Sequence, residues 1–140
     1  SFGGPSVLMT RKQNIDAVAL WDPSYQISLI SKEYGVPGGC FVKEIGAYIM
    51  PWGISTAIGE AMAEEVDTIK WDTLAPSFKP PFLLVLAGNG VLVKKAVNYY
   101  KTGTSQKKLV VIKGATHGFN DSAAIQRSLF SHTLRWFKKF

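Results

Sequence analysis

The chain has 140 residues, of which 46% are hydrophobic and 19% are charged, which is enough apolar sequence for the core of one domain and argues against a disordered chain. Its net charge of +6 comes from scattered lysines, so we expect a solvated surface and no nucleic-acid partner. The single cysteine, Cys40, excludes an internal disulfide and a metal site built from several cysteines.

The first elements in chain order are a short helix and a buried strand. Residues 1–11 read as a turn that feeds a helix, with Pro5 in the first turn, where proline is tolerated. Residues 15–21 form an apolar strand that Asp22-Pro23-Ser24 closes. The segment 25–53 is less regular: we expect a short helix over 25–34, a turn at 37–39, and one or two strands within 40–50.

The second half of the chain alternates more clearly. Apolar spacing predicts a helix over 54–70, and three prolines predict a loop over 71–81. A buried strand over 82–87 follows, then a helix that stops at Gly103, a β-branched strand over 109–112, and a last helix capped by Asn120 or Asp121. The side chains that we expect to face the core from this helix are Ile125, Leu129, Phe130, Leu134 and Phe137.

This order predicts an α/β fold. Unbroken apolar strands that alternate with helices are typical of a parallel sheet covered on both faces. Three strands make a small sheet of this kind, so we expect further strands before Ser1.

Polar side chains follow each of the three buried strands. Asp22 comes directly after the first strand, and Asn89 and His117 lie in the loops that begin after the second and third strands. Because the carboxyl ends of parallel strands share one edge of the sheet, we expect these residues to lie along one rim. A carboxylate and an imidazole on that rim are two of the three members of a Ser-His-Asp triad.

The first four residues, Ser1-Phe2-Gly3-Gly4, supply a nucleophile. A serine followed by X-Gly at the start of a helix matches the second half of the G-x-S-x-G nucleophile elbow. The alternative is an N-terminal nucleophile, whose own amine acts as the base. Enzymes of that class begin with a strand of an antiparallel sandwich, which the helix-like start and the parallel pattern do not favour.

The serine, the aspartate and the histidine occur here in the chain order of α/β-hydrolases. The chain resembles the C-terminal half of that fold, and especially the dienelactone-hydrolase and serine-aminopeptidase-like esterases. The motifs that carry the resemblance are Ser1-Phe2-Gly3-Gly4, Ala19-Leu20-Trp21-Asp22-Pro23, Pro81-Phe82-Leu83-Leu84-Val85-Leu86-Ala87-Gly88 and Gly114-Ala115-Thr116-His117-Gly118-Phe119.

The resemblance implies a single hydrolase segment over 1–140, with a variable, lid-like insert over 25–75. It also implies a further N-terminal half, in the same protein or as a second chain. The family's usual acid position falls on Val91, which cannot orient an imidazole. Some members carry the acid after the preceding strand, which in this chain is Asp22, so we assign the acid there. The alternative is a member that has lost its acid.

The resemblance implies a serine esterase that needs no cofactor and no metal. Ser1 would attack the carbonyl of a small-molecule ester, His117 would carry the proton, and Asp22 would fix the imidazole tautomer. The Phe2 amide would donate one oxyanion hydrogen bond, and the second donor would come from the N-terminal half.

Other interpretations compete with this one. Val91 favours a non-catalytic hydrolase-like binding module, whereas a flavodoxin-like nucleotide binder would need a longer glycine-rich loop than Gly88-Asn89-Gly90. In the insert, Tyr48 and Trp52 are candidates for an acyl pocket. We expect His132 to be a surface residue. The chain has no long apolar run and no signal peptide before its first residue, so we expect a soluble, cytoplasmic protein without a membrane partner.

Overall fold

The computed structural model describes residues 3–9, 14–24, 40–45, 47–51, 55–69, 71–90 and 92–140. They divide into two compact units: residues 1–25 together with 71–140, here called the sheet unit, and residues 26–70. The expected helix at 25–34 and the turn at 37–39 lie outside the described residues.

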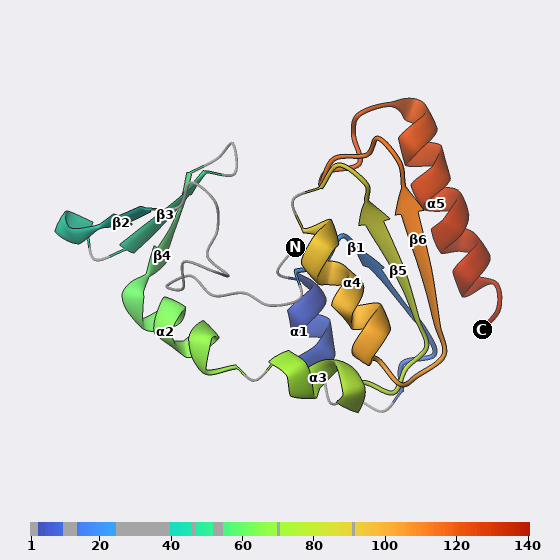
Figure 1. The fold of residues 1–140 in the computed structure, drawn as a ribbon, viewed down its shortest axis with the longest axis horizontal. Helices are drawn as coiled ribbons and strands as arrows, with labels where there is room; N and C mark the ends of the chain where they lie inside the picture. The colour runs from blue at the N-terminus through green and yellow to red at the C-terminus, as the bar shows by residue number, and fades with distance from the viewer. Residues whose placement is uncertain are drawn as a thin grey trace. The chain divides into compact units, whose positions relative to one another are not determined.

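The sheet unit is an α/β fold built on a three-stranded parallel sheet, as the sequence predicts (Figure 1). The strands β1 (Val18–Trp21), β5 (Phe82–Ala87) and β6 (Lys107–Ile112) lie in the order β1-β5-β6. All six residues of β5, the central strand, are buried. A strand buried on both faces needs an unbroken apolar run, which Phe82-Leu83-Leu84-Val85-Leu86-Ala87 provides.

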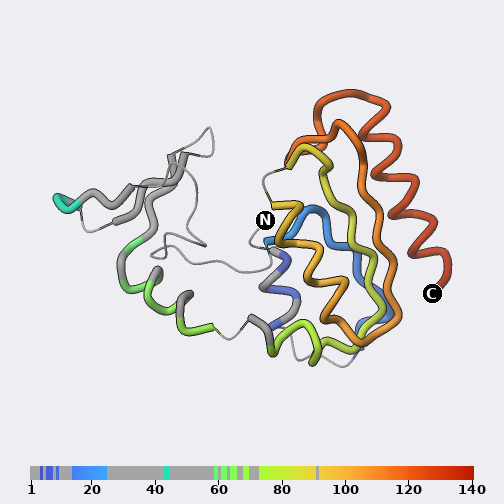
Figure 2. The backbone as a smooth tube through the Cα atoms, in the orientation of Figure 1, coloured from blue at the N-terminus to red at the C-terminus, as the bar shows by residue number. Residues whose placement is uncertain are grey.

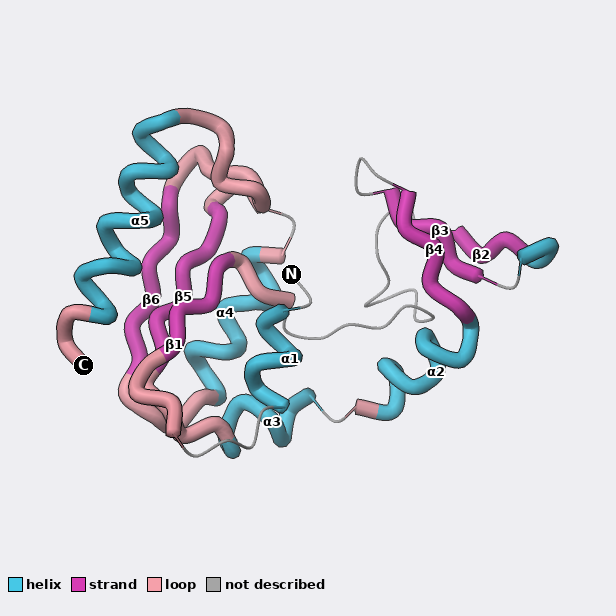
Figure 3. Tube along the Cα trace, turned by 180° about the vertical axis from the view of Figure 1, so that it is seen from behind, coloured by secondary structure: helices cyan, strands magenta, loops and turns pink. Residues whose placement is uncertain are grey.

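Helices cover both faces of this sheet (Figure 3). The helices α1 (Gly3–Met9), α3 (Trp71–Ser77) and α4 (Val93–Thr102) lie on one face, and α5 (Ala123–Phe137) lies on the other. Because the side chains of successive strand residues point to opposite faces, β5 contributes side chains to two separate cores. Its residues Phe82, Leu84 and Leu86 pack with α3 and α4, whereas Leu83, Val85 and Ala87 pack with α5.

The expected loop over 71–81 is wrong in its first part, because α3 occupies residues 71–77 with Pro76 inside it. Proline is poorly tolerated inside a helix. Tertiary packing outweighs that preference here: Ala75 and Phe78 are almost fully buried in the core on the α4 face. Residues 71–75, which the sequence assigned to the insert, therefore contribute to the sheet unit.

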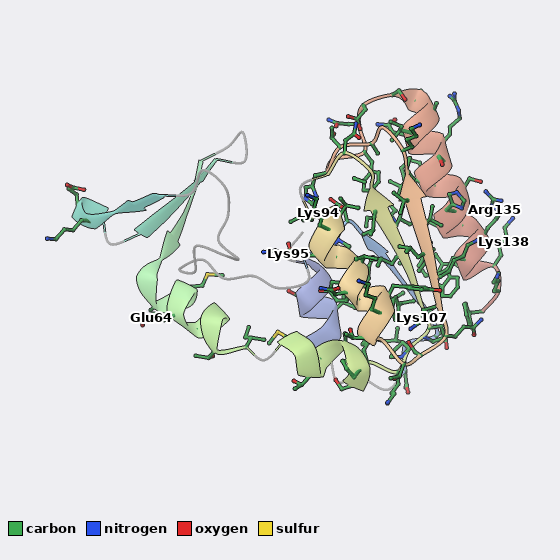
Figure 4. All side chains as sticks on the ribbon, in the orientation of Figure 1. Glu64, Lys94, Lys95, Lys107, Arg135 and Lys138 are labelled. Atoms are coloured by element: carbon green, nitrogen blue, oxygen red, sulfur yellow. The ribbon has the colours of Figure 1, made fainter. Side chains whose placement is uncertain are left out.

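The last helix is correctly predicted, and so are two of the side chains expected to face the core, because Leu129 is buried and Ile125 packs against the same core. The other three expected side chains do not face the core. Phe130, Leu134 and Phe137 are between 45% and 61% exposed, whereas Leu129, Thr133 and Trp136 are buried. The cap is Ser122, whose Oγ accepts the Ile125 N–H at 3.2 Å, and neither Asn120 nor Asp121 caps this helix. The exposed basic residues Arg135 and Lys138 lie on the outside of α5 (Figure 4).

The unit formed by residues 26–70 contains an antiparallel sheet. Its strands are β2 (Cys40–Val42), β3 (Ala47–Pro51) and β4 (Ser55–Gly59), in the order β2-β3-β4, with a short 3-10 helix, η1 (Lys43–Ile45), between the first two. The prediction of one or two strands within 40–50 is confirmed. The helix expected over 54–70 begins only at Glu60, as α2 (Glu60–Thr68), because residues 55–59 pair with β3.

Candidate active site

Asp22 lies at the carboxyl end of β1 and is completely buried. Its N–H donates to the Val85 carbonyl at 2.7 Å, and its Oδ1 accepts the Ala87 N–H at 3.1 Å. A buried carboxylate is costly unless hydrogen bonds replace its hydration. The backbone of β5 supplies one of these bonds, so the carboxylate is fixed at the edge where an α/β sheet carries its functional residues.

The turn after β5 leaves room for this carboxylate only because residue 90 is glycine. A Cβ atom at Gly90 would lie 2.9 Å from Asp22 Oδ2 and 3.0 Å from the Ala87 Cβ. The first distance is shorter than real Cβ contacts, and the second is tighter than nine in ten of them, so a side chain at this position would displace the carboxylate. The nearby Asp22 carboxylate is therefore a structural reason for glycine at position 90, which the sequence pattern alone did not indicate.

His117 lies in the loop between β6 and α5, and its Nδ1 is 2.7 Å from Asp22 Oδ2. The two residues are 95 positions apart in the sequence. An ionised carboxylate can only accept hydrogen bonds, so opposite such a carboxylate Nδ1 is the donor. In the neutral ring, Nε2 then keeps its lone pair and can act as a base. The imidazole is 43% exposed whereas the carboxylate is fully buried, so the ring lies between the Asp22 carboxylate and the solvent.

The loop that carries His117 is tied to the loop that follows β5. The Asn89 N–H donates to the Ala115 carbonyl at 2.9 Å, and the Ala115 N–H donates to the Ile112 carbonyl at 3.2 Å. Ala115 and Phe119 are buried on either side of the exposed His117. These loops lie side by side beyond the carboxyl ends of the strands (Figure 2). Asn89 therefore lies on the same rim as the pair, as the sequence predicts.

Backbone strain is concentrated around the same pair. Among the described non-glycine residues, only Asp22 (φ 40°) and Phe119 (φ 52°) have positive φ angles. Such angles are uncommon outside glycine and asparagine or aspartate, and a buried phenylalanine is an unusual place for one. Strained backbone that the surrounding structure holds in place is frequent at functional sites.

Asp121 holds the His117 loop from its far end and does not cap α5. Its Oδ2 accepts the Thr116 N–H at 2.8 Å, and its Oδ1 accepts the Thr116 hydroxyl at 2.7 Å. The backbone hydrogen bond and then the hydroxyl lower the pKa of Asp121, because both favour the ionised form. The sequence pattern alone did not distinguish this role from a helix cap, since both use an acidic side chain just before a helix.

The first turn of α1 packs directly on the residue after Asp22. A Cβ atom at Gly4 would clash with the Cβ of Pro23, so the close approach of helix and loop requires glycine at this position. The segment after Asp22 is also held from α4, where the buried Tyr99 hydroxyl donates to the Ser24 carbonyl at 2.6 Å. Ser1 and Phe2, the predicted nucleophile and oxyanion donor, lie outside the described residues, as does Val91.

No side chain within the described ranges joins a cluster of three or more histidine, cysteine, aspartate or glutamate residues that would hold a metal ion. Over the same ranges, no helix combines the length and the apolar character needed to cross a membrane. The chain matches no protein-family model, and a search of curated proteins finds no match.

Proposed function

We propose that this chain is the C-terminal part of an α/β-hydrolase that cleaves small-molecule esters through an acyl-enzyme, with the triad Ser1, His117 and Asp22. The observation that carries the proposal is the 2.7 Å contact between His117 Nδ1 and the buried Asp22 carboxylate. A buried carboxylate on Nδ1 is the arrangement that orients the histidine of a serine hydrolase. Asp22 thereby offers an acid that Val91, in the family's usual position, cannot.

In the proposed reaction, Ser1 Oγ attacks the ester carbonyl carbon while Nε2 of His117 takes the hydroxyl proton. The tetrahedral oxyanion accepts a hydrogen bond from the Phe2 amide. When the intermediate collapses, the bond to the alkoxy oxygen breaks and His117 returns the proton to the departing alcohol. A water molecule then attacks the acyl-enzyme by the same route, releasing the carboxylic acid and restoring Ser1.

Two features of the described residues support a nucleophile near this pair. Gly4, three residues after Ser1, packs against Pro23, which directly follows Asp22. The α1 helix lies on the face covered by α4, with Val7 packed in that core. The Asp22 end of β1 and the first turn of α1 are therefore neighbours, which is what a short elbow before the helix requires.

The proposal includes a segment before Ser1 that supplies the second oxyanion donor, as part of the same protein or as a second chain. Strands that are linked through a helix in one sheet almost always make right-handed crossovers. Since α1 lies on the same face as α4, a strand leading into α1 would pair with the edge of β1 that no strand of the described residues occupies. Trp21 of β1 and Phe130 of α5 are half-exposed, with their ring centroids 5.8 Å apart, and offer an apolar surface beside β1 for such a segment.

Ester hydrolysis by the full-length protein tests the proposal, with a p-nitrophenyl ester as the probe. Replacing Asp22 with asparagine keeps the shape of the side chain but removes its control of the imidazole tautomer, so kcat should fall by roughly 10⁴-fold. His117→Ala should cause a loss of similar order. Absence of ester hydrolysis in the wild type, together with a ligand affinity that Asp22→Asn leaves unchanged, would instead favour the non-catalytic binding module.

A further inference from the structure

We propose that Asp121 is a positioning residue, which holds the loop 116–121 so that the His117 imidazole keeps its place against Asp22. This inference rests on the proposed function for its catalytic meaning, but the arrangement itself is structural. Asp121 touches neither His117 nor Asp22 in any hydrogen bond of the described residues. It would act entirely through Thr116.

The two Asp121 hydrogen bonds close the loop 116–121, which contains His117. One joins Oδ2 to the Thr116 N–H and the other joins Oδ1 to the Thr116 hydroxyl, at 2.8 and 2.7 Å. Both carboxylate oxygens are thus used on one residue, the immediate neighbour of His117. Hydrogen bonds to an ionised acceptor are shorter and stronger than neutral ones, which suits a contact that must hold an exposed loop.

The rest of this loop cannot fix the imidazole by packing alone. The residues Thr116, His117, Gly118 and Asn120 are exposed, and Phe119 is the buried residue between them. Phe119 reaches its place with a positive φ of 52°, and its N–H donates to the Thr116 carbonyl at 3.0 Å. Thr116 therefore makes one hydrogen bond with Phe119 and two with Asp121. If Asp121 releases it, the strained turn can relax and the imidazole can turn away from the carboxylate.

Asp121 does not cap α5, although its position just before this helix suggests that role. The α5 cap is the neighbouring Ser122, whose Oγ accepts the Ile125 N–H. The helix keeps this cap when Asp121 is replaced. Substitution of Asp121 therefore affects the loop separately from the helix, and Ser122→Ala offers a matched control at the next residue.

The test compares Asp121→Asn, Thr116→Val and Thr116→Ser in the full-length protein, with p-nitrophenyl acetate as the probe. Asp121→Asn should lower kcat by about 10- to 100-fold, because small displacements of a catalytic group cost this much. KM should stay nearly unchanged, since neither Thr116 nor Asp121 is placed to bind substrate. Thr116→Val should also lower kcat, and Thr116→Ser, which keeps the hydroxyl, should restore it.

Proton NMR of the His117 ring gives a readout that does not depend on activity. The Nδ1 proton in the contact with Asp22 should give a downfield signal in the wild type and in Thr116→Ser. This signal should broaden or move in Asp121→Asn and Thr116→Val. Ser122→Ala should lower the melting temperature but leave the signal and kcat in place.

Two results would overturn the inference. The first is an unchanged His117 signal in both Asp121→Asn and Thr116→Val. The second is a signal that Ser122→Ala disturbs as much as Asp121→Asn does, since this would reflect a general loosening of α5. If the wild type does not hydrolyse esters but its His117 signal still depends on Asp121, the hydrolase proposal fails while the positioning role stands.

Discussion

At the residue scale, Gly90 is the position at which a single methyl group should disturb the candidate site. Gly90→Ala would place a Cβ 2.9 Å from Asp22 Oδ2. We expect the carboxylate to move away from His117, with a stability loss of about 1–3 kcal/mol from overpacking. The loss is measured by chemical unfolding, and the contact by the Nδ1 proton signal of His117.

Gly59→Ala is the matched control for this substitution, because no atom lies within 4 Å of a Cβ built at Gly59. It should leave both the stability and the His117 signal near the wild-type values. An unperturbed His117 signal in Gly90→Ala would contradict the view that the turn after β5 is shaped around the carboxylate.

His132 should make the stability of the fold depend on pH. Burial, and then the positive charges of Arg135 and Lys108, lower the pKa of His132 below its ordinary value of 6.5. As the pH falls below 6.5, His132 therefore binds a proton in the unfolded chain but not yet in the folded protein, and the free energy of unfolding decreases. The decrease ends once the pH is below the lowered pKa of the folded state.

Replacing His132 with glutamine should remove this contribution. Urea unfolding midpoints measured above and below pH 6.5 should differ less in His132→Gln than in the wild type. An identical pH dependence in the two proteins would show that His132 titrates as it does in the unfolded chain.

The pairing of Asp22 with His117 could be predicted from the sequence, although its details could not. Strand ends are visible as apolar runs, and the parallel arrangement brings their carboxyl ends to one edge. The space at Gly90 and the reach of Asp121 to Thr116 depend on loop conformations, which a single sequence does not specify.

At the element scale, the two faces of α5 should respond very differently to truncation. Leu129 is 3% exposed and packs with β5 and β6, whereas Leu134 is 61% exposed. We expect Leu129→Ala to cost about 2–5 kcal/mol of unfolding free energy, and Leu134→Ala to change it by less than about 0.5 kcal/mol. Equal losses in the two variants would contradict the assignment of the buried face.

The existence of α5 was easier to predict than its orientation. Apolar side chains surround much of the helix, so spacing alone permitted a face with Phe130, Leu134 and Phe137 as well as the observed one. Trp21 contacts the observed buried face, because its Nε1 donates to the buried Thr133 Oγ1 at 3.0 Å, and its ring also meets the half-exposed Phe130 edge to face. Trp21 and Thr133 are 112 positions apart, so a local sequence pattern cannot indicate this contact.

The errors at 55–59 and 71–77 have the same origin. Residues 55–59 have spacing that fits a helix, but they pair with β3. Residues 71–77 include a proline, but α3 buries Ala75 against the sheet. In both segments, contacts with a distant part of the chain outweigh local propensity.

At the scale of the whole molecule, the sheet unit should fold without residues 26–70. Both buried clusters identified among the described residues consist only of side chains from the sheet unit. Replacing 26–70 with a flexible glycine-serine linker should therefore retain a cooperative unfolding transition and the His117 signal.

A longer replacement, which extends to residue 77, serves as the control. Replacing 26–77 also removes α3 and with it the buried Ala75, so this variant should unfold at distinctly lower denaturant. If both variants unfold at the same denaturant concentration, the boundary of the sheet unit at residue 71 is wrong. If neither folds, the two units depend on each other for stability.

The most direct test of the central claim is covalent labelling of the full-length protein with a fluorophosphonate, followed by mass spectrometry of the peptides. A serine activated by the His117–Asp22 pair should carry the phosphonyl group, so we expect a single adduct on Ser1 that is lost or greatly slowed in His117→Ala. No adduct on Ser1, or labelling that proceeds equally fast without His117, would contradict the assignment of a serine hydrolase triad.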